Sequence, residues 1–283
     1  MKIAVTAANG QLGKAIVNAL KEELGAKSVV GIVRTPEKAK NLGIEVRKGD
    51  YNSKEEFLES LKGIDRLLLV SGMDLPEKRI GQHRNVIEAA KENGVEKIVY
   101  TSIIGDEHQS GFKPIVKSNR QTEQDIRNSG MDWAIGRNGI YIEPDIEYLD
   151  HYIKAGEISN SAGEGKCGYT TRAELGFAYA KLLTSDSLKG QVFNLCGQCI
   201  SQTELANLFN EVFDTKLSYK PLTVEEYKKE RIQALGDFIG TVIAGIYEGI
   251  QLGANEVNSN FEEVTGREHL SPKAMIQSLE QNT

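Results

Sequence analysis

The feature that most constrains the fold is a glycine-rich turn close to the first residue. A short run of β-branched and small residues, 3–5, has the length of a buried strand and leads into the turn Ala7-Ala8-Asn9-Gly10. Apolar residues then recur at helical spacing from Leu12 to Leu20. Strand, glycine turn and helix in this order form the first unit of a dinucleotide-binding fold, because the turn amides and the helix N-terminus favour a pyrophosphate.

This turn carries the first group of predicted cofactor-binding residues. Its spacing follows the Gly-x-x-Gly-x-x-Gly pattern, except that Ala7 occupies the first position and narrows the turn by a methyl group. A strand-to-helix turn in another kind of α/β protein is the alternative interpretation. The residues predicted to bind the cofactor here are Thr6, Ala8, Asn9, Gly10, Gln11 and Leu12.

The composition argues against several classes of protein. The 283 residues are 26% charged and 40% hydrophobic with a net charge of −6, which is ordinary for a soluble globular protein. No long basic run is present, so nucleic-acid binding is disfavoured. The longest weakly polar stretch, 238–250, is too short to span a bilayer and contains Glu248. With no secretory signal, we expect a cytoplasmic protein.

Strand and helix patterns alternate along the first half of the chain, which predicts an α/β fold with a doubly wound, Rossmann-type parallel sheet. We place a nucleotide-binding Rossmann domain at 1–142 and a smaller, mostly helical lobe that covers the substrate at 143–283. After the first unit, the predicted strands are 28–33, 44–47, 65–70, 97–101 and 131–136, and the helices are 54–61, 77–93 and 119–128.

The second half is less periodic. The segment 143–164 is polar and predicted to be irregular, with one short helix near 148–155. A helix is predicted from 172 to 183, and a strand at 191–195 is compatible with a return to the main sheet. Ser201, with Glu204 three residues later, is typical of the start of a helix.

The residues after the second strand indicate the type of cofactor. NAD-specific folds place an acidic residue near this point, whereas this chain has Arg34, with Lys38 one helical turn further on. A cation here suits the 2′-phosphate of NADP, and a charge-assisted hydrogen bond contributes roughly 1.5–3 kcal/mol. A solvated arginine at a strand end is the alternative interpretation.

Polar and small residues follow the next strands at the edge where ligands of parallel sheets bind. Asp50 could accept a hydrogen bond from the adenine amine with Tyr51 against the ring; alternatively, Asp50 caps a turn and the following helix. The predicted cofactor-binding residues at the ends of the fourth and fifth strands are Ser71, Gly72, Met73 and Thr101.

The common short-chain dehydrogenase site needs a tyrosine with a lysine four residues later, because the cation lowers the pKa of the phenol. None of the 10 tyrosines has this lysine, so the usual proton donor is missing. No H-E-x-x-H, G-x-S-x-G or P-loop motif is present. An electron-poor acceptor such as a quinone can take a hydride without a dedicated acid, which fits such a site.

The three cysteines do not form a disulfide framework. Cys196 and Cys199 form a C-x-x-C pair, which is compatible with a redox pair or with half of a zinc site. No second pair completes a four-thiolate site, so no metal is predicted. The favoured interpretation is two ordinary thiols near a strand end.

The chain resembles the NmrA-like, atypical short-chain dehydrogenase/reductase proteins, and in particular the flavin-free, type 2 NADPH-dependent quinone oxidoreductases and the triphenylmethane-dye reductases. Most of the matching segments lie in the first half of the chain, and few lie in the second half. The matching segments are 5–6, 10–13, 32–34, 36–39, 49–51, 67–70, 82–87, 100–102, 122–123, 137–139, Tyr141, 171–172 and 194–209.

The resemblance implies NADPH held by the glycine turn, Arg34, the segment 71–73 and residues Arg137, Asn138 and Gly139. It also implies a substrate between the nicotinamide and the C-terminal lobe. Asn138 and Tyr141 would orient cofactor and substrate as the catalytic pair, and neither need be a proton donor. Asn119 departs from the family, whose members often carry a histidine or a catalytic lysine there, and Lys117 would point elsewhere on the helix.

Two functions are compatible with these residues. The first is an NADPH-dependent reductase that transfers hydride directly to quinones or similar electron-poor aromatic acceptors, with dyes or nitro compounds as further acceptors. The second is an NADP(H)-sensing regulatory protein of the NmrA-like type that binds a protein partner without turnover. The expected ligand of the reductase is a small quinone-like molecule, and a homodimer is an assembly compatible with the sequence.

Overall fold

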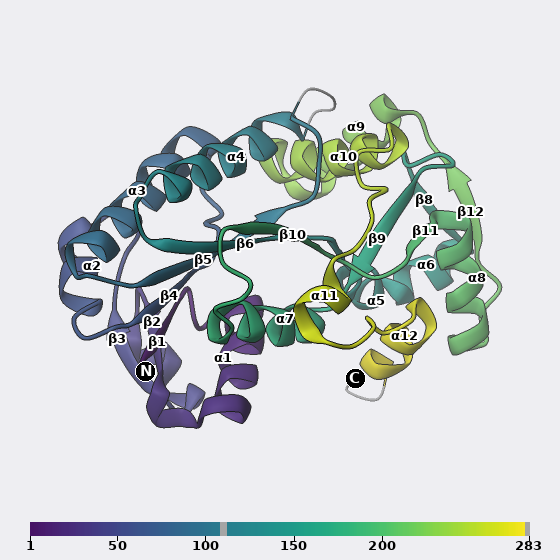
Figure 1. Cartoon of the computed structure of the whole chain (residues 1–283). Coiled ribbons are helices and arrows are strands. Elements are labelled where there is room, and N and C mark those ends of the chain that lie inside the picture. The colour runs from purple at the N-terminus through teal and green to yellow at the C-terminus, as the bar shows by residue number, and fades with distance from the viewer. Residues whose placement is uncertain (108–111, 281–283) are drawn as a thin grey trace.

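The computed structural model describes residues 1–107 and 112–280. Its centre is a parallel sheet of 7 strands in the order β10-β6-β5-β4-β1-β2-β3 (Figure 1). The chain starts in the middle, at β1, and adds strands outwards on both sides, which is the doubly wound arrangement predicted. The strands are β1 Ile3–Thr6, β2 Val29–Val33, β3 Glu45–Lys48, β4 Arg66–Leu69, β5 Lys97–Ile103, β6 Asp132–Asn138 and β10 Gln191–Leu195.

Helices cover both faces of this sheet, which explains why its central strands are apolar on both sides. Two of them, α1 Gln11–Leu24 and α7 Arg172–Thr184, pack side by side on one face. The other face carries α2 Lys54–Ser60, α3 Pro76–Glu92 and α4 Lys113–Arg127 (Figure 1). Short 3-10 turns, η1 Ala26–Ser28 and η2 Pro36–Leu42, flank β2. Because all seven strands of the central sheet run in parallel, their C-terminal ends meet at one edge.

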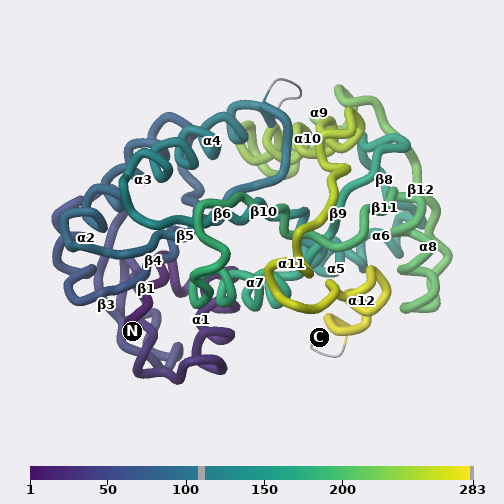
Figure 2. The backbone as a smooth tube through the Cα atoms, viewed as in Figure 1, coloured from purple at the N-terminus to yellow at the C-terminus, as the bar shows by residue number. Residues whose placement is uncertain are grey.

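The second half of the chain builds two small sheets and a group of helices beside that edge. One sheet pairs β7 Ile140–Tyr141, β9 Lys166–Thr170 and β11 Cys199–Ser201, and the other pairs β8 Glu157–Asn160 with β12 Ser218–Pro221. Figure 2 shows the last segment running from α10 past β9 to α11 and α12. The helices are α5 Glu143–Glu147, α6 Leu149–Ala155, α8 Gln202–Phe213, α9 Val224–Leu235, α10 Asp237–Gln251, α11 Phe261–Thr265 and α12 Pro272–Glu280.

The predicted strand at 191–195 is confirmed, and it pairs in parallel with β6, so it does return to the main sheet. The capping box of Ser201 and Glu204 is also confirmed. Two predictions were wrong. Helix α4 starts at Lys113 rather than at residue 119, because Pro114 fits its first turn. The segment 143–164 is not irregular apart from α6, since it also contains α5 and β8. The domain boundary at residue 142 stays a prediction.

The three cysteines lie in the small sheet and at its junction with β10 as free thiols. Burial raises the pKa of Cys196 to about 12 and raises the pKa of Cys167 and Cys199 as well. Protonated thiols are poor nucleophiles, which favours the interpretation as ordinary thiols.

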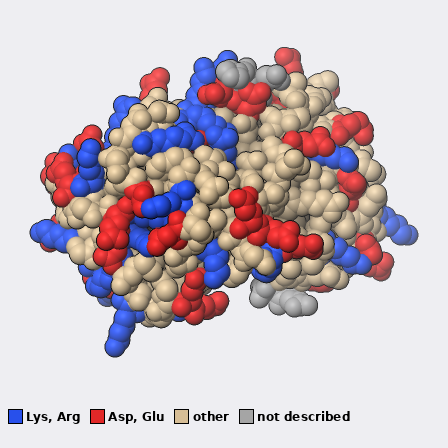
Figure 3. Space-filling view, in the orientation of Figure 1, with Lys and Arg blue, Asp and Glu red and all other residues tan. Residues whose placement is uncertain are grey.

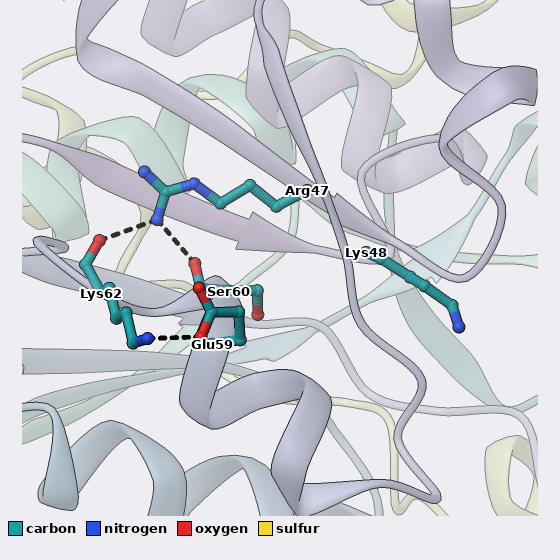
Figure 4. A pocket seen from close by; sticks show the side chains of 5 residues that line it. All are labelled: Arg47, Lys48, Glu59, Ser60 and Lys62. Atoms are coloured by element: carbon teal, nitrogen blue, oxygen red, sulfur yellow. Dashed lines mark hydrogen bonds and ion pairs between the residues drawn. The ribbon is translucent and has the colours of Figure 1, made fainter.

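Acidic and basic side chains alternate over the face shown in Figure 3, with one gathering of lysine and arginine above α4. Across residues 1–107 and 112–280, no helix is both long enough and apolar enough to cross a membrane. A surface hollow of about 350 Å³ beside β3 and α2 holds Arg47, whose guanidinium donates hydrogen bonds to the carbonyls of Ser60 and Lys62 (Figure 4). These bonds satisfy carbonyls at the C-terminal end of α2, which is a structural role.

Candidate functional site

The glycine turn joins β1 to α1 at the C-terminal edge of the sheet. Ala7 adopts a φ of 47°, in the left-handed region, and its carbonyl accepts a hydrogen bond from the Gly10 amide at 2.9 Å. Holding an alanine in this region costs about 1 kcal/mol. The turn therefore keeps the glycine-type conformation although Ala7 stands at its first position. A Cβ atom on Gly13 would lie 2.3 Å from the Ala7 carbonyl oxygen, so this position requires glycine.

Among residues 1–107 and 112–280, no side chain caps the first amide groups of helix α1, which directly follow this turn. Its N-cap, Gly10, provides no side-chain hydrogen bond, and its first turn contains no acidic residue. Unpaired amides at the positive end of a helix dipole are the groups that bind a pyrophosphate. Of the other residues predicted here, Gln11 is exposed, Asn9 and Leu12 are partly exposed, and Ala8 is buried.

The end of β2 lies next to the glycine turn, because the Ala8 amide donates a hydrogen bond to the Ile32 carbonyl at 3.4 Å. Arg34 follows β2 directly, and both Arg34 and Lys38 are exposed. Within the described part of the chain, neither cation forms a hydrogen bond or an ion pair with another side chain. Both are therefore available to an anionic group bound beside the turn.

Asp50 and Tyr51 lie at the same edge but engage protein groups. Asp50 accepts hydrogen bonds from the backbone amide and the side chain of Asn52 at 2.9 and 2.8 Å, so it caps a turn, while Ser53 caps α2. The Tyr51 hydroxyl contacts the Thr6 hydroxyl and the Val70 carbonyl, each at 2.6 Å. The cofactor contacts of Thr6, Asp50 and Tyr51 stay predictions.

The loop after β4 is held in place by helix α3. The Gly72 amide donates to Nε2 of His83 at 3.0 Å, and the other ring nitrogen, Nδ1, donates to the Thr122 hydroxyl at 2.9 Å. Burial and the nearby charge of Arg79 lower the pKa of His83 to about 3, so the ring is neutral. His83 thus positions the loop as a neutral, hydrogen-bonded histidine.

The rest of this loop connects to β5 and is open to solvent. The Ser71 amide donates to the Thr101 hydroxyl at 2.9 Å, while Met73 is 89% exposed. Asn119 is fully buried and accepts a hydrogen bond from the Tyr100 hydroxyl at 2.6 Å. Lys117 is exposed, as expected from its position on the helix. Asn119, where the resemblance led us to expect a histidine or a lysine, is therefore a structural amide in this chain.

The Arg137 side chain is bound by Glu123 and is not free at the C-terminal edge of the sheet. Its guanidinium donates to both oxygens of Glu123, at 2.9 and 2.7 Å. The Glu123 side chain is fully buried and also pairs with Arg120 and Arg127. Burial acts to raise the pKa of Glu123, but hydrogen bonds from Arg137 and the charge of Arg120 outweigh it and lower that pKa. This cluster joins the end of β6 to α4, and a contact of Arg137 with the cofactor stays a prediction.

The predicted catalytic pair is brought together where β6 ends, at Asn138, and β7, which contains Tyr141, follows. The Asn138 side chain donates a hydrogen bond through Nδ2 to the Tyr141 hydroxyl at 3.1 Å. Its Oδ1 accepts one from the Tyr179 hydroxyl at 2.6 Å. Gly139 lies between them, and a Cβ atom there would be 2.3 Å from the Gly168 carbonyl oxygen. The required glycine lets β7 turn away from β6 directly after Asn138.

Two residues that sequence reasoning did not assign to the site surround this pair. Tyr179, on α7, fixes the orientation of the Asn138 amide. Arg172, the first residue of α7, places its guanidinium carbon 5.7 Å from the centre of the Tyr141 ring. Arg172 entered the sequence analysis only as part of a segment that matches relatives, and no local pattern singles out Tyr179.

One further ionisable residue, four residues after Tyr141 in the sequence, is buried in the second half of the chain. Asp145, on α5, accepts a hydrogen bond from the Tyr152 hydroxyl at 2.8 Å, and burial raises its pKa to about 6. Because the folded state holds this proton more tightly than the unfolded chain, stability declines as the pH rises from about 4 to 6.

We expect Asp145→Asn to remove this decline. The variant keeps the acceptor for Tyr152, so its unfolding free energy should match the wild type near pH 4 and exceed it by about 2–3 kcal/mol at pH 7. Urea unfolding at the two pH values measures the difference. An equal difference at both pH values would show that Asp145 is not held protonated.

Comparisons with known proteins agree with the dinucleotide-binding geometry of the glycine turn and the parallel sheet. A family model described as NAD(P)H-binding matches residues 7–185. Quinone oxidoreductase 2 of Escherichia coli is 33% identical over 230 residues, which cover 80% of this chain and 79% of that protein.

Two solved structures share the whole architecture. The NADPH-dependent quinone oxidoreductase of Escherichia coli, complexed with NADPH, has a TM-score of 0.91 at 29% identity, covering 98% of this chain and 99% of its own. The triphenylmethane reductase of a Citrobacter species, complexed with NADP(H), has a TM-score of 0.90 at 31% identity, covering 98% and 100%.

The sheet order and the turn before α1 define a dinucleotide-binding protein of the Rossmann class. The chain belongs to the NAD(P)H-binding family and is homologous to quinone oxidoreductase 2, to NmrA-like reductases and to triphenylmethane reductase. It is an NAD(P)H-dependent oxidoreductase, and the comparisons support NADPH as its cofactor.

Proposed function

We propose that the protein is an NADPH-dependent reductase that transfers hydride directly to quinones or similar electron-poor aromatic acceptors. The observation that supports this most is the pair of Asn138 and Tyr141 at the C-terminal edge, with no lysine placed as in the common dehydrogenases. The names of the homologues, a quinone oxidoreductase and a dye reductase, point to the same class of acceptor.

The chain offers a coherent set of groups for NADPH. The free amides of α1 would hold the pyrophosphate, and Arg34 with Lys38 would hold the 2′-phosphate. The segment 71–73 and residues Thr101, Asn138 and Gly139 would line the path to the nicotinamide. In this proposal residues 1–142 bind the nucleotide and residues 143–283 cover the substrate.

Bound NADPH supplies the hydride, and the protein's contribution is to orient the two reactants and exclude water. Asn138 is 6% exposed and fixed through Tyr179, so its amide forms a rigid wall of the site. A quinone needs little activation for hydride transfer, so a site with few titratable groups suffices.

The sensor function remains a second candidate because Met73 and Leu75, beside the proposed cofactor path, are 89% and 56% exposed. Exposed apolar residues next to a ligand site suit a partner whose binding depends on the cofactor. Oxidation of NADPH with a panel of simple quinones, run beside NADH and a control without acceptor, separates the two. Turnover with NADPH well above NADH supports the reductase, and tight NADPH binding without turnover supports the sensor.

We expect Arg34→Ala to weaken NADPH binding about 10- to 100-fold with little change for NADH, since only NADPH carries the 2′-phosphate. Fluorescence titration of both cofactors measures this. Lys40→Ala is the matched control, an exposed lysine on η2 outside the proposed site. Equal losses for the two cofactors would contradict the assignment of Arg34.

A further inference from the structure

We propose that Tyr141 is the proton donor of the reaction and that Arg172 is the cation that supports it. This inference rests on the proposed reductase function. In the common dehydrogenases, a tyrosine and a lysine four residues later share this role. Here we assign it to two residues from different elements. Tyr141 belongs to β7 and Arg172 to α7.

The hydrogen bonds around Tyr141 leave its own proton free to be donated. Asn138 presents an N–H group to the phenol oxygen, so the phenol acts as the acceptor in that bond. The amide oxygen lies 2.6 Å from the Tyr179 hydroxyl and accepts from it, and that hydroxyl also lies 2.9 Å from the Gly136 carbonyl oxygen. In this orientation of the amide, the O–H of Tyr141 is left for an acceptor other than Asn138, and the ring is only partly buried.

Arg172 is held over the Tyr141 ring by the start of α7. Its backbone amide donates to Oε1 of Glu143 at 2.6 Å, and its guanidinium pairs loosely with the exposed Glu147 at 3.6 Å. The Arg172 side chain is 18% exposed, so its charge acts on the phenol with limited screening. A cation above the ring face stabilises negative charge on the phenol oxygen.

The two residues lie at the edge where the cofactor is expected. Helices α1 and α7 run in parallel, since Gly176 packs against Ala15 at their starts and Thr184 donates to Glu23 near their ends. Arg172 precedes Gly176 by four residues, as Gln11 precedes Ala15. The N-terminus of α7 therefore lies level with the N-terminus of α1, which is the proposed pyrophosphate site.

The proton balance of quinone reduction explains why such a donor is useful. The quinone receives the hydride from NADPH and becomes a hydroquinone anion, and one of its oxygens takes the proton of Tyr141. The tyrosinate formed beside Arg172 then recovers a proton from water. The overall change consumes one NADPH and one proton and yields hydroquinone and NADP⁺.

The ionisation of the phenol is compatible with this role. Burial raises the pKa of Tyr141 to about 12, while the Asn138 hydrogen bond and the Arg172 charge oppose that rise. Tyr179 and Glu143 also face the phenol, and Glu147 pairs with Arg172. The phenol is thus fully protonated at neutral pH before each turnover.

A comparison of two acceptors tests the proposal. A cationic triphenylmethane dye becomes a neutral product on receiving a hydride and needs no proton, whereas a quinone needs one. We expect Tyr141→Phe to lower kcat/KM for a quinone about 100-fold, and Arg172→Gln to lower it about 10-fold, with dye reduction changed less than about threefold. In a double variant the two losses should not add, because both act through the same phenol.

Lys181→Gln is the matched control, because Lys181 lies on the same helix with its ammonium 5.4 Å from the centre of the Phe177 ring. It should leave both acceptors unaffected. Equal losses with quinone and dye in Tyr141→Phe or Arg172→Gln would overturn the proposal and assign these residues to structure. If the wild type reduces neither acceptor, the proposed function fails instead.

A measurement without cofactor completes the test. The alkaline titration of Tyr141 is obtained as the difference in tyrosinate absorbance between the wild type and Tyr141→Phe. Arg172→Gln should move this titration to higher pH, because it removes the charge that opposes the rise in pKa. An unchanged titration would show that Arg172 does not act on the phenol.

Discussion

Gly13→Ala is expected to weaken NADPH binding at least about tenfold and to destabilise the protein by about 1–3 kcal/mol. The added Cβ atom would lie 2.3 Å from the Ala7 carbonyl oxygen and 2.9 Å from the Ala8 Cα atom. Both neighbours are backbone atoms, so the turn itself has to open. Its displacement moves the amides at the start of α1 away from the pyrophosphate.

The matched control for this variant is Gly81→Ala. Gly81 lies within α3, is exposed, and an added Cβ atom meets no other atom within 4 Å. This substitution should stabilise the protein by about 0.5–1 kcal/mol, because alanine favours the helix. Thermal unfolding and fluorescence titration with NADPH measure both variants. If Gly13→Ala binds NADPH as well as the wild type, the turn does not hold the pyrophosphate.

Glu123→Ala is expected to lower the unfolding free energy by about 3–5 kcal/mol. The buried carboxylate of Glu123 pairs with Arg120, Arg127 and Arg137, and it also accepts a hydrogen bond from Ser102 at 2.7 Å. Removing it leaves three cations without their shared partner at the junction of β5, β6 and α4. Because the pKa of Glu123 is lowered by its partners, its contribution should also fade as the pH falls below the usual glutamate pKa of 4.5 and through the lowered pKa of the folded state.

Asp125→Ala, two residues later on α4, provides the control. Asp125 pairs with Arg84, whose side chain is 50% exposed, so its loss should cost less than about 1 kcal/mol. Chemical denaturation at pH 7 measures both variants. Similar losses for the two would contradict the central position given to Glu123.

Most of the Rossmann sheet could be predicted from the sequence, because its strands are short apolar runs that need only local information. The strand at 191–195 was predicted with the bounds it has in the structure. The strands β7, β9 and β11 were not predicted. Their pairing depends on distant partners, as where Cys199 lies opposite Gly168, and their residues show no alternation that a local pattern could reveal.

The site could be predicted only in part, because some of its contacts also join residues that are distant in the sequence. The glycine turn and Arg34 are contiguous with a strand end, so their positions follow from the order of elements. Tyr179 and Arg172 come to Asn138 and Tyr141 through the packing of α7, more than thirty residues further along the chain. A search for a lysine at fixed spacing from each tyrosine could not find a cation supplied by another helix.

The central claim is direct hydride transfer from NADPH to a quinone-like acceptor on this protein. A single-turnover experiment with NADPH deuterated at the transferred position, mixed with enzyme and a quinone in the absence of flavin, tests it most directly. We predict oxidation of the bound NADPH with a primary deuterium isotope effect. Bound NADPH that stays reduced with every acceptor would contradict the reductase and support the sensor.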